Sequence, residues 1–259
     1  MNGPSLRLAL GCGLVSLSAL AETPTIRFGL EAQYSPFESK SDSGQLQGFD
    51  IEIGNAVCAA AHMTCKWVET SFDGLIPGLQ GRRFDAINSA MTASEKRRQV
   101  IDFTTEIYRL PTQLMARTSS GLEATPESLK GLRVGILKAS IQETYAMSYW
   151  RPAGVDVVAY ENQNQIYGDL VAGKLDATLV LVPAGKNAFL SRPNGEGFGF
   201  VGKPVRDDLI LGNGVAFGIR KGDGALLNRL NTAIAKIRAD GTLKALAQKY
   251  FGDIDVSTK

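Results

Sequence analysis

The amino-acid sequence predicts an α/β protein with two similar lobes. From residue 24 on, short strand-like runs alternate with helical stretches, as in a mostly parallel sheet with helices on its faces. A second strand-turn-helix series starts with the apolar run 132–137. Segments 79–86 and 170–177 also match each other in their Leu, basic, apolar, Asp and Ala positions. Although α/β proteins reuse this pattern, its recurrence in two successive series favours two lobes of one architecture.

The first series is predicted from its apolar spacing, taken in chain order. It comprises a strand at 26–30, a helix at 50–61, a strand at 67–68, a helix at 74–80 and a strand at 84–87. The second series follows the loop-like stretch 118–126. Near the C-terminus, Leu226, Leu230, Ile234 and Ile237 recur at helical spacing, and Gly241 separates this helix from a last one.

Composition and charge exclude several functional classes. The chain has 259 residues, of which 44% are hydrophobic, so it can bury a full core. Its 28 Lys and Arg nearly balance its 26 Asp and Glu, and no basic run offers a nucleic-acid surface. With His62 as the single histidine, a multi-His metal site is ruled out, and we expect no metal and no cofactor.

One glycine-rich segment resembles a phosphate-binding loop and is rejected. Residues 197–203 have the spacing, but Pro204 stands where a Ser or Thr should hold magnesium. The segment is predicted to be a loop, and the match is attributed to chance.

The N-terminal residues 1–21 have the features of a secretory signal peptide. Arg7 precedes an apolar run at 8–20, and Ala19-Leu20-Ala21 fits a cleavage site after Ala21. A transmembrane anchor is the alternative, but the run is short of the ~20 residues that span a bilayer. Lipidation at Cys12 is a weaker alternative, because its surroundings fit a lipobox poorly. We therefore expect an exported, periplasmic protein.

Removal of the signal leaves two cysteines, Cys58 and Cys65. In an oxidising compartment such a pair favours a disulfide, here between a helix and the following strand. Two buried free thiols are the alternative. A redox site is disfavoured because the spacing is not C-x-x-C.

Several motifs together resemble one known family, the periplasmic solute-binding proteins of ABC transporters, and in particular the lysine/arginine/ornithine and histidine binders. The motifs are Tyr34-Ser35-Pro36-Phe37, Gly48-Phe49-Asp50-Ile51, Phe72-Asp73-Gly74-Leu75-Ile76-Pro77, Ser94-Glu95-Lys96-Arg97, Asp240-Gly241-Thr242 and Lys249-Tyr250-Phe251. The resemblance implies a two-lobed type II fold that closes on its ligand by hinge motion. It places lobe I at 22–108 and 212–259, lobe II at 113–205, and the hinge at 109–112 and 206–211. It also implies the disulfide between Cys58 and Cys65.

The resemblance further implies roles for nine residues. Arg97 would grip the ligand carboxylate through its planar guanidinium. Thr92 and Glu95 resemble a capping box at the start of the same helix. Tyr34 and Phe72 would sandwich the ligand side chain, and Glu31 would face its distal charge. The full set of implied ligand contacts is Glu31, Tyr34, Phe72, Ser89, Ala90, Thr92, Arg97, Ser140 and Gln142.

One position departs from the pattern of the family. Leu181 stands where the family has an aspartate for the α-ammonium of the ligand, and no acid occurs from Ala177 to Asn194. An unpaired ammonium there would be costly. Either the ligand lacks a free α-amine, or Glu31 serves that amine.

The function expected from the sequence is non-enzymatic. A monomeric chain would bind a small carboxylate, with a cationic amino acid as first choice, and deliver it to a membrane ABC permease. The alternatives are an amino-acid derivative without a free α-amine as ligand, an enzyme on this scaffold with Glu31 as general acid, or a receptor that signals to a membrane sensor.

Overall fold

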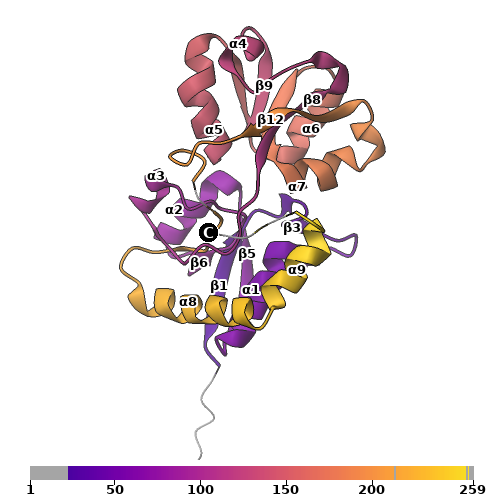
Figure 1. The fold of residues 1–259 in the computed structure, drawn as a ribbon. Coiled ribbons are helices and arrows are strands. Elements are labelled where there is room, and N and C mark those ends of the chain that lie inside the picture. The colour runs from indigo at the N-terminus through magenta and orange to yellow at the C-terminus, as the bar shows by residue number, and fades with distance from the viewer. Residues whose placement is uncertain (1–22, 213, 255, 257–259) are drawn as a thin grey trace, which may run out of the picture.

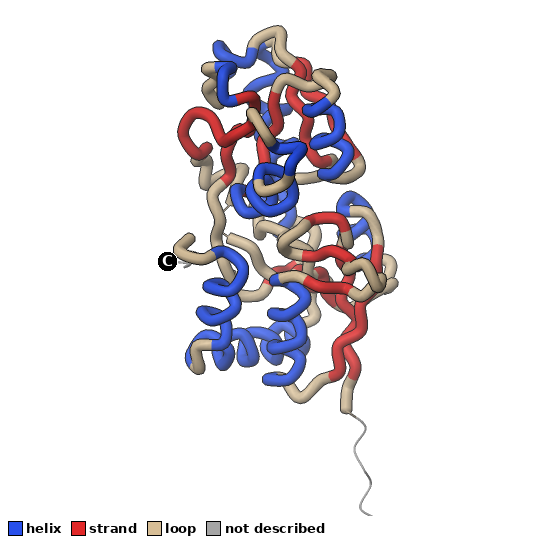
Figure 2. Tube along the Cα trace, turned by 90° about the vertical axis from the view of Figure 1, so that its right-hand side faces the viewer, coloured by secondary structure: helices blue, strands red, loops and turns tan. Residues whose placement is uncertain are grey.

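The two lobes lie one above the other in the computed structural model, which describes residues 23–212, 214–254 and 256 (Figure 1). Lobe I contains a five-stranded sheet of order β5-β1-β6-β13-β7, and lobe II contains one of order β10-β9-β11-β8-β12. The side view in Figure 2 shows helices around the strands in both lobes. The predicted two-lobed α/β fold is confirmed.

Lobe I is built from the two ends of the described chain. Its main elements are β1 (Thr25–Leu30), α1 (Phe49–Ala60), β5 (Thr64–Glu69), α2 (Leu75–Gln80), β6 (Ala86–Ile87), α3 (Glu95–Arg98), β7 (Asp102–Phe103), β13 (Gly218–Ile219), α8 (Gly224–Ala239) and α9 (Thr242–Phe251). A small separate sheet consists of β2 (Gln33–Tyr34), β3 (Glu38–Lys40) and β4 (Leu46–Gln47).

Lobe II is one continuous stretch of chain. It contains β8 (Thr112–Arg117), α4 (Pro126–Leu129), β9 (Arg133–Leu137), α5 (Ile141–Tyr145), β10 (Asp156–Tyr160), α6 (Gln163–Val171), β11 (Ala177–Leu181), α7 (Val182–Gly185) and β12 (Phe198–Val205). The predicted strand near 132–137 is therefore present as β9.

Each sheet combines parallel and antiparallel pairs. In lobe I, β1 pairs in parallel with β5 and β6, as the βαβ pattern predicts, while β13 pairs antiparallel with β6 and β7. In lobe II, β9 pairs in parallel with β10 and β11, while β8 pairs antiparallel with β11 and β12. The antiparallel pairs in both sheets thus involve strands next to the chain crossings between the lobes.

The segment 197–203 is not a loop, so that prediction was wrong. It lies largely in β12, which pairs with β8 over residues 198–201. Gly197 and Gly202 have φ values of 77° and 61°, and the register shifts between Val201 and Val205. Gly197 therefore lies directly before the strand, and Gly202 lies at its irregularity.

Helix α1 shows how local sequence fixes an element of lobe I. Gly48 precedes it with φ 131°, and a Cβ there would lie 2.2 Å from the carbonyl oxygen of Phe37. Only glycine fits this position. The helix buries Ile53 and Val57, and its Cys58 is bonded to Cys65 with a Cα–Cα distance of 5.9 Å. The predicted disulfide is present.

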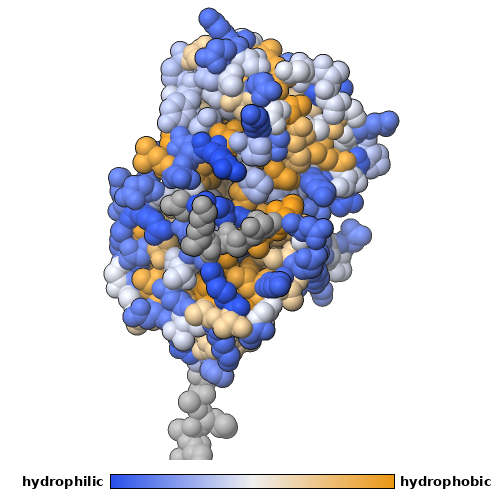
Figure 3. Space-filling model, in the orientation of Figure 1, coloured by the Kyte–Doolittle hydropathy of each residue, from blue (hydrophilic) through white to orange (hydrophobic). Residues whose placement is uncertain are grey.

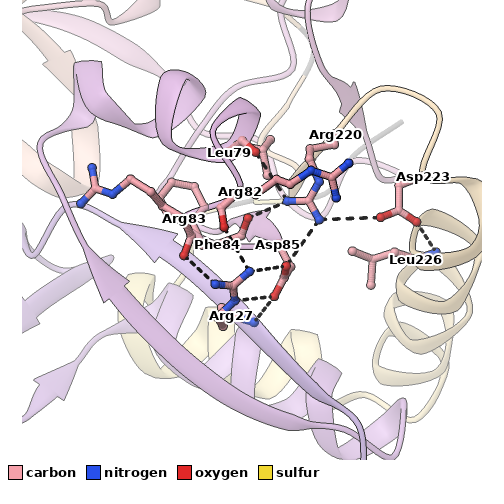
Figure 4. A network of polar contacts seen from close by, with 9 residues as sticks. All are labelled: Arg27, Leu79, Arg82, Arg83, Phe84, Asp85, Arg220, Asp223 and Leu226. Carbon is pink, nitrogen blue, oxygen red and sulfur yellow. Dashed lines mark hydrogen bonds and ion pairs between the residues drawn. The ribbon is translucent and has the colours of Figure 1, made fainter.

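A charged network joins the two chain segments of lobe I (Figure 4). Arg27 of β1 donates from Nε and Nη2 to the two carboxylate oxygens of Asp85, at 3.0 and 2.9 Å. Arg220, after β13, donates to the carbonyl oxygen of Phe84 at 2.6 Å and forms an ion pair with Asp85 at 3.4 Å. Asp223 then caps α8 by accepting from the amide of Leu226 at 3.2 Å. Asp85 thus fixes the C-terminal segment against β1.

Polar residues cover most of the face in Figure 3, with apolar patches beside the junction of the lobes. Among the described residues, no helix combines the length and the apolar character needed to cross a bilayer.

Candidate functional site

Arg97 lies buried at the junction of the two lobes. Its side chain comes from the four-residue helix α3, and the residue is 7% exposed. Nη1 donates to the carbonyl oxygen of Thr92 at 2.8 Å, and Nη2 donates across the junction to that of Ala139 at 2.9 Å. The guanidinium carbon is 5.4 Å from the centroid of the Phe72 ring. The guanidinium is therefore held over an aromatic ring between the lobes.

The surroundings of Arg97 leave its charge without a counterion. Burial lowers the pKa of Arg97 to about 10, and no carboxylate of the described residues contributes to that shift. Both hydrogen-bond partners are neutral carbonyl groups. A buried cation with only neutral partners is a strong attractor for an anion, and its planar fork suits a carboxylate.

The capping box predicted from Thr92 and Glu95 is wrong. The residue that precedes α3 is Ser94, and its side chain makes no capping hydrogen bond. Thr92 instead forms an isolated bridge with Val215 of the returning chain. The bridge of Thr92 to a residue more than a hundred positions away thus takes precedence over the capping-box pattern in the local sequence.

Lobe II contributes the start of α5 to the junction. Ser140 caps this helix by accepting from the amide of Glu143 at 3.0 Å, and Glu143 accepts from the amide of Ala139 at 2.7 Å. Gln142 donates to the hydroxyl of Thr112 at 3.2 Å. Ala139 has φ 58°, a strained conformation for alanine, and its carbonyl accepts from Arg97.

Three buried acids lie in lobe I. Glu31, Glu38 and Asp50 are 4%, 0% and 1% exposed. Ser89 links two of them, because its hydroxyl donates to Glu38 at 2.7 Å and accepts from the amide of Glu31 at 3.0 Å.

Asp50 has a full set of partners, whereas the other two acids do not. Asp50 accepts from the amide of Ala90 at 2.6 Å and from the hydroxyl of Tyr108 at 2.8 Å. Among the described residues, Oε2 of Glu31 and Oε2 of Glu38 are buried without a hydrogen-bond partner. Each of these two carboxyl groups therefore has one buried oxygen whose capacity to accept a hydrogen bond is not used.

Burial and mutual repulsion shift the titration of these acids. Burial raises the pKa of Glu31 to about 7, although the backbone of Gln33 donates to it. The pKa of Asp50 rises to about 6, because burial outweighs its hydrogen bonds from Ala90 and Tyr108. Burial and the nearby Asp50 raise the pKa of Glu38 well above its usual range. A cation placed among these groups would relieve the repulsion.

The interlobe pocket lies between Arg97 and the lobe II residues. Seven of the nine predicted ligand contacts line it, and Leu137, Ile141 and Leu181 complete the lining. Glu31 and Ser89 do not line it, although Ser89 directly precedes the lining residue Ala90 and accepts from the amide of Glu31 at 3.0 Å. The pocket measures about 20 Å³, roughly the space of one water molecule. An amino-acid-sized solute can enter only if the lobes separate.

A larger cavity adjoins the pocket beside the chain segments that connect the lobes. It measures about 640 Å³ and shares Thr92, Ile141 and Leu181 with the interlobe pocket. The segments 109–112 and 204–208 form much of its lining. The described residues contain no group of three or more His, Cys, Asp and Glu side chains that could hold a metal ion.

The model of the bacterial extracellular solute-binding proteins, family 3, matches residues 26–253. The chain belongs to this family. The lysine/arginine/ornithine-binding periplasmic protein of Escherichia coli (strain K12) is 42% identical over 95% of both chains. The histidine-binding periplasmic protein of the same strain is 41% identical over 97% of this chain and 96% of the relative. A solved ancestral arginine-binding protein, bound to arginine, matches with TM-score 0.81 and 28% identity over 88% of this chain and 98% of its own.

Three features of the site were missed from the sequence. Glu38 and Asp50 lie inside or beside the quoted motifs, which could have drawn attention to their chemistry. The strained backbone of Ala139 has no signal in the sequence, because alanine rarely takes positive φ.

Proposed function

We propose that this family member captures a small solute with a carboxylate at one end and a cation at the other, and delivers it to an ABC permease. The carboxylate would replace the Ala139 carbonyl as the partner of Arg97. The distal cation would lie against Glu31 and Glu38. Tyr34, Phe72, Ser89, Ala90, Thr92, Ser140 and Gln142 would complete the contacts.

The unpaired Arg97 and the two buried acids Glu31 and Glu38 carry this proposal. Arg97 has no counterion among the described residues, and Glu31 and Glu38 each have an oxygen without a partner. A buried charge is stable in proteins when it is paired. A ligand with opposite charges at its two ends would pair both.

The names of the relatives support the same ligand class. Lysine, arginine, ornithine and histidine, named in those relatives, all combine a carboxylate with a cationic or protonatable side chain. Cationic amino acids are therefore the first compounds to test.

We further propose that the chain acts by hinge motion and without catalysis. The hinge would be 109–112 and 206–211, between lobe I at 22–108 and 212–259 and lobe II at 113–205. Export would remove residues 1–21, which lie outside the described residues, and the periplasmic product would be a monomer. The relatives named above are binding proteins, which supports a role in binding. Unchanged ligand after prolonged incubation, measured by chromatography, would agree with this, and product formation would contradict it.

Calorimetry with L-arginine and two of its analogues tests the ligand class. L-Arginine carries both charged ends, agmatine lacks the carboxylate, and L-norvaline lacks the distal cation. We expect the compound with both ends to bind at least about 100-fold more tightly than either analogue, because each lost charge leaves a buried partner unpaired. Equal binding of agmatine and arginine would contradict the role of Arg97. Loss of uptake in a strain without the protein would distinguish transport from signalling.

A further inference from the structure

The larger cavity, beside the segments that connect the lobes, is large enough to hold part of a ligand. Its volume of about 640 Å³ lies within the range of about 300 to 1,000 Å³ typical of small-molecule sites. Its described lining combines apolar side chains, among them Leu110, Pro111, Val205 and Leu211, with the charged side chains of Arg109, Arg206, Asp207 and Asp208. Because it shares Thr92, Ile141 and Leu181 with the interlobe pocket, the two spaces meet along the wall that these residues form.

The α-ammonium of an amino-acid ligand would lack an acidic partner at this wall. In an α-amino acid the nitrogen lies about 2.5 Å from the carboxylate carbon, so a carboxylate on Arg97 places the nitrogen inside the interlobe pocket. The described lining of that pocket includes no Asp or Glu, and Leu181 is 6% exposed there. Burying a charged ammonium beside leucine and isoleucine without an acid is unfavourable.

We propose that the ligand carries an acyl group on its α-nitrogen, and that this group extends past Leu181 into the larger cavity. Acylation removes the charge of the nitrogen and adds a chain that can contact the apolar part of this lining, at Leu110, Pro111, Val205 and Leu211. The inference rests on the proposed function, because it takes the carboxylate at Arg97 and the cation at Glu31 and Glu38 as given. The ligand class is thus an Nα-acylated cationic amino acid.

Two kinds of acyl group share this chemistry. One is a short fatty acyl chain, and the other is an aminoacyl group, as in a dipeptide that ends in arginine. Asp207 and Asp208 also line the cavity, where they could accept the terminal ammonium of a dipeptide. Tighter binding of Ala-Arg than of Nα-butanoyl-L-arginine would identify the acyl group as an aminoacyl group. Tighter binding of Nα-butanoyl-L-arginine would identify it as a fatty acyl chain.

Calorimetry on the mature protein tests the inference with L-arginine, Nα-butanoyl-L-arginine, Ala-Arg and 5-guanidinopentanoate, which has no α-substituent. We expect at least one Nα-acylated compound to bind at least tenfold more tightly than L-arginine. If L-arginine binds as tightly as both acylated compounds or more tightly, the inference is overturned and the proposed function stands. If no compound with a carboxylate and a distal cation binds, the proposed function fails and the inference fails with it.

A pair of variants tests where the acyl group lies. Leu211 lines the cavity, whereas Leu209 in the same loop is 72% exposed and does not. Leu211→Trp should weaken binding of the preferred acylated compound at least tenfold and leave 5-guanidinopentanoate within twofold, because the larger ring fills only the cavity. Leu209→Trp should change neither. Equal losses for both compounds in Leu211→Trp, or no loss for either, would overturn this placement.

Discussion

Lys138 of lobe II forms an ion pair with Asp73 of lobe I, with 2.9 Å between Nζ and Oδ2. Lys138 also contacts Glu161 of its own lobe at 3.0 Å. The two acids together raise the pKa of Lys138, and Lys138 with Ser71 holds the pKa of Asp73 below its usual range. The pair with Asp73 joins the lobes and can exist only while they are closed.

This ion pair predicts an effect on ligand release. Asp73→Asn should speed ligand dissociation by a few-fold, because the closed form loses one contact between the lobes. The effect is small, since exposed ion pairs are weak and screened by salt. Glu161→Gln is the matched control, because it removes a contact of Lys138 within one lobe and leaves the interlobe pair. Stopped-flow release rates check the prediction, which fails if both variants behave alike.

Truncation of Arg97 should abolish most ligand binding. Arg97→Ala is expected to cost about 3 kcal/mol or more, a factor of at least about 100 in Kd, because a charge-assisted pair in a closed site is lost. Lys96→Ala removes an exposed cation from the same helix and should leave Kd unchanged. Near-normal calorimetric affinity in Arg97→Ala would refute the carboxylate assignment.

Glu31 should make the stability of the ligand-free protein depend on pH. Its pKa rises to about 7 in the folded protein from an ordinary value near 4.5, so the folded state binds more protons between these values. Stability therefore falls as pH rises through this window. The contribution of Glu31 is about 3 kcal/mol across the window, at 1.36 kcal/mol per pKa unit.

Melting temperatures of a Glu31→Gln variant at pH 5 and pH 8 measure this contribution. The variant should match the unmodified protein near pH 5 and exceed it at pH 8, because glutamine has no charge to bury. Glu95→Gln, at an exposed position, should follow the unmodified protein at both values. A constant difference between Glu31→Gln and the unmodified protein would contradict the raised pKa.

Reduction of the disulfide between Cys58 and Cys65 should destabilise lobe I. The bond closes a short loop between α1 and β5, and the chain-entropy model gives about 2 to 3 kcal/mol for such a loop. In a protein of this size that corresponds to a drop of roughly 4 to 10 °C in Tm. Thermal melts with and without reductant check it, with the double Cys→Ser variant as the control that reductant should not affect.

Much of the fold could be predicted because its elements have strong local patterns. The long amphipathic helix α8 follows from Leu230, Ile234 and Ile237, which are all buried. Strands β1 and β9 follow from apolar runs that bury their residues almost throughout. Each of these elements must bury its apolar side chains, whichever other element covers them, and the spacing of those side chains is therefore visible in the sequence.

Other features depend on partners that are far away in the sequence. Strand β12 contains two glycines and Pro204, which favour a loop, and its pairing with β8 decides the outcome. The fully buried Glu38 shares Ser89 with Glu31 across more than fifty residues, a contact that only the folded chain creates. Acidic residues are ordinarily exposed, so no local sequence pattern predicts that three carboxyl groups are buried.

The network around Asp85 has a consequence for the order of folding. Lobe II is one continuous stretch of chain, so it can reach its native pairing as soon as the chain up to the end of β12 is free to fold. Lobe I needs Arg220 and α8 to join Arg27 and Asp85, and these parts are made last. We therefore expect lobe II to acquire protease resistance first as the chain becomes free to fold from its N-terminal end, and lobe I to follow once its C-terminal elements have paired with β1.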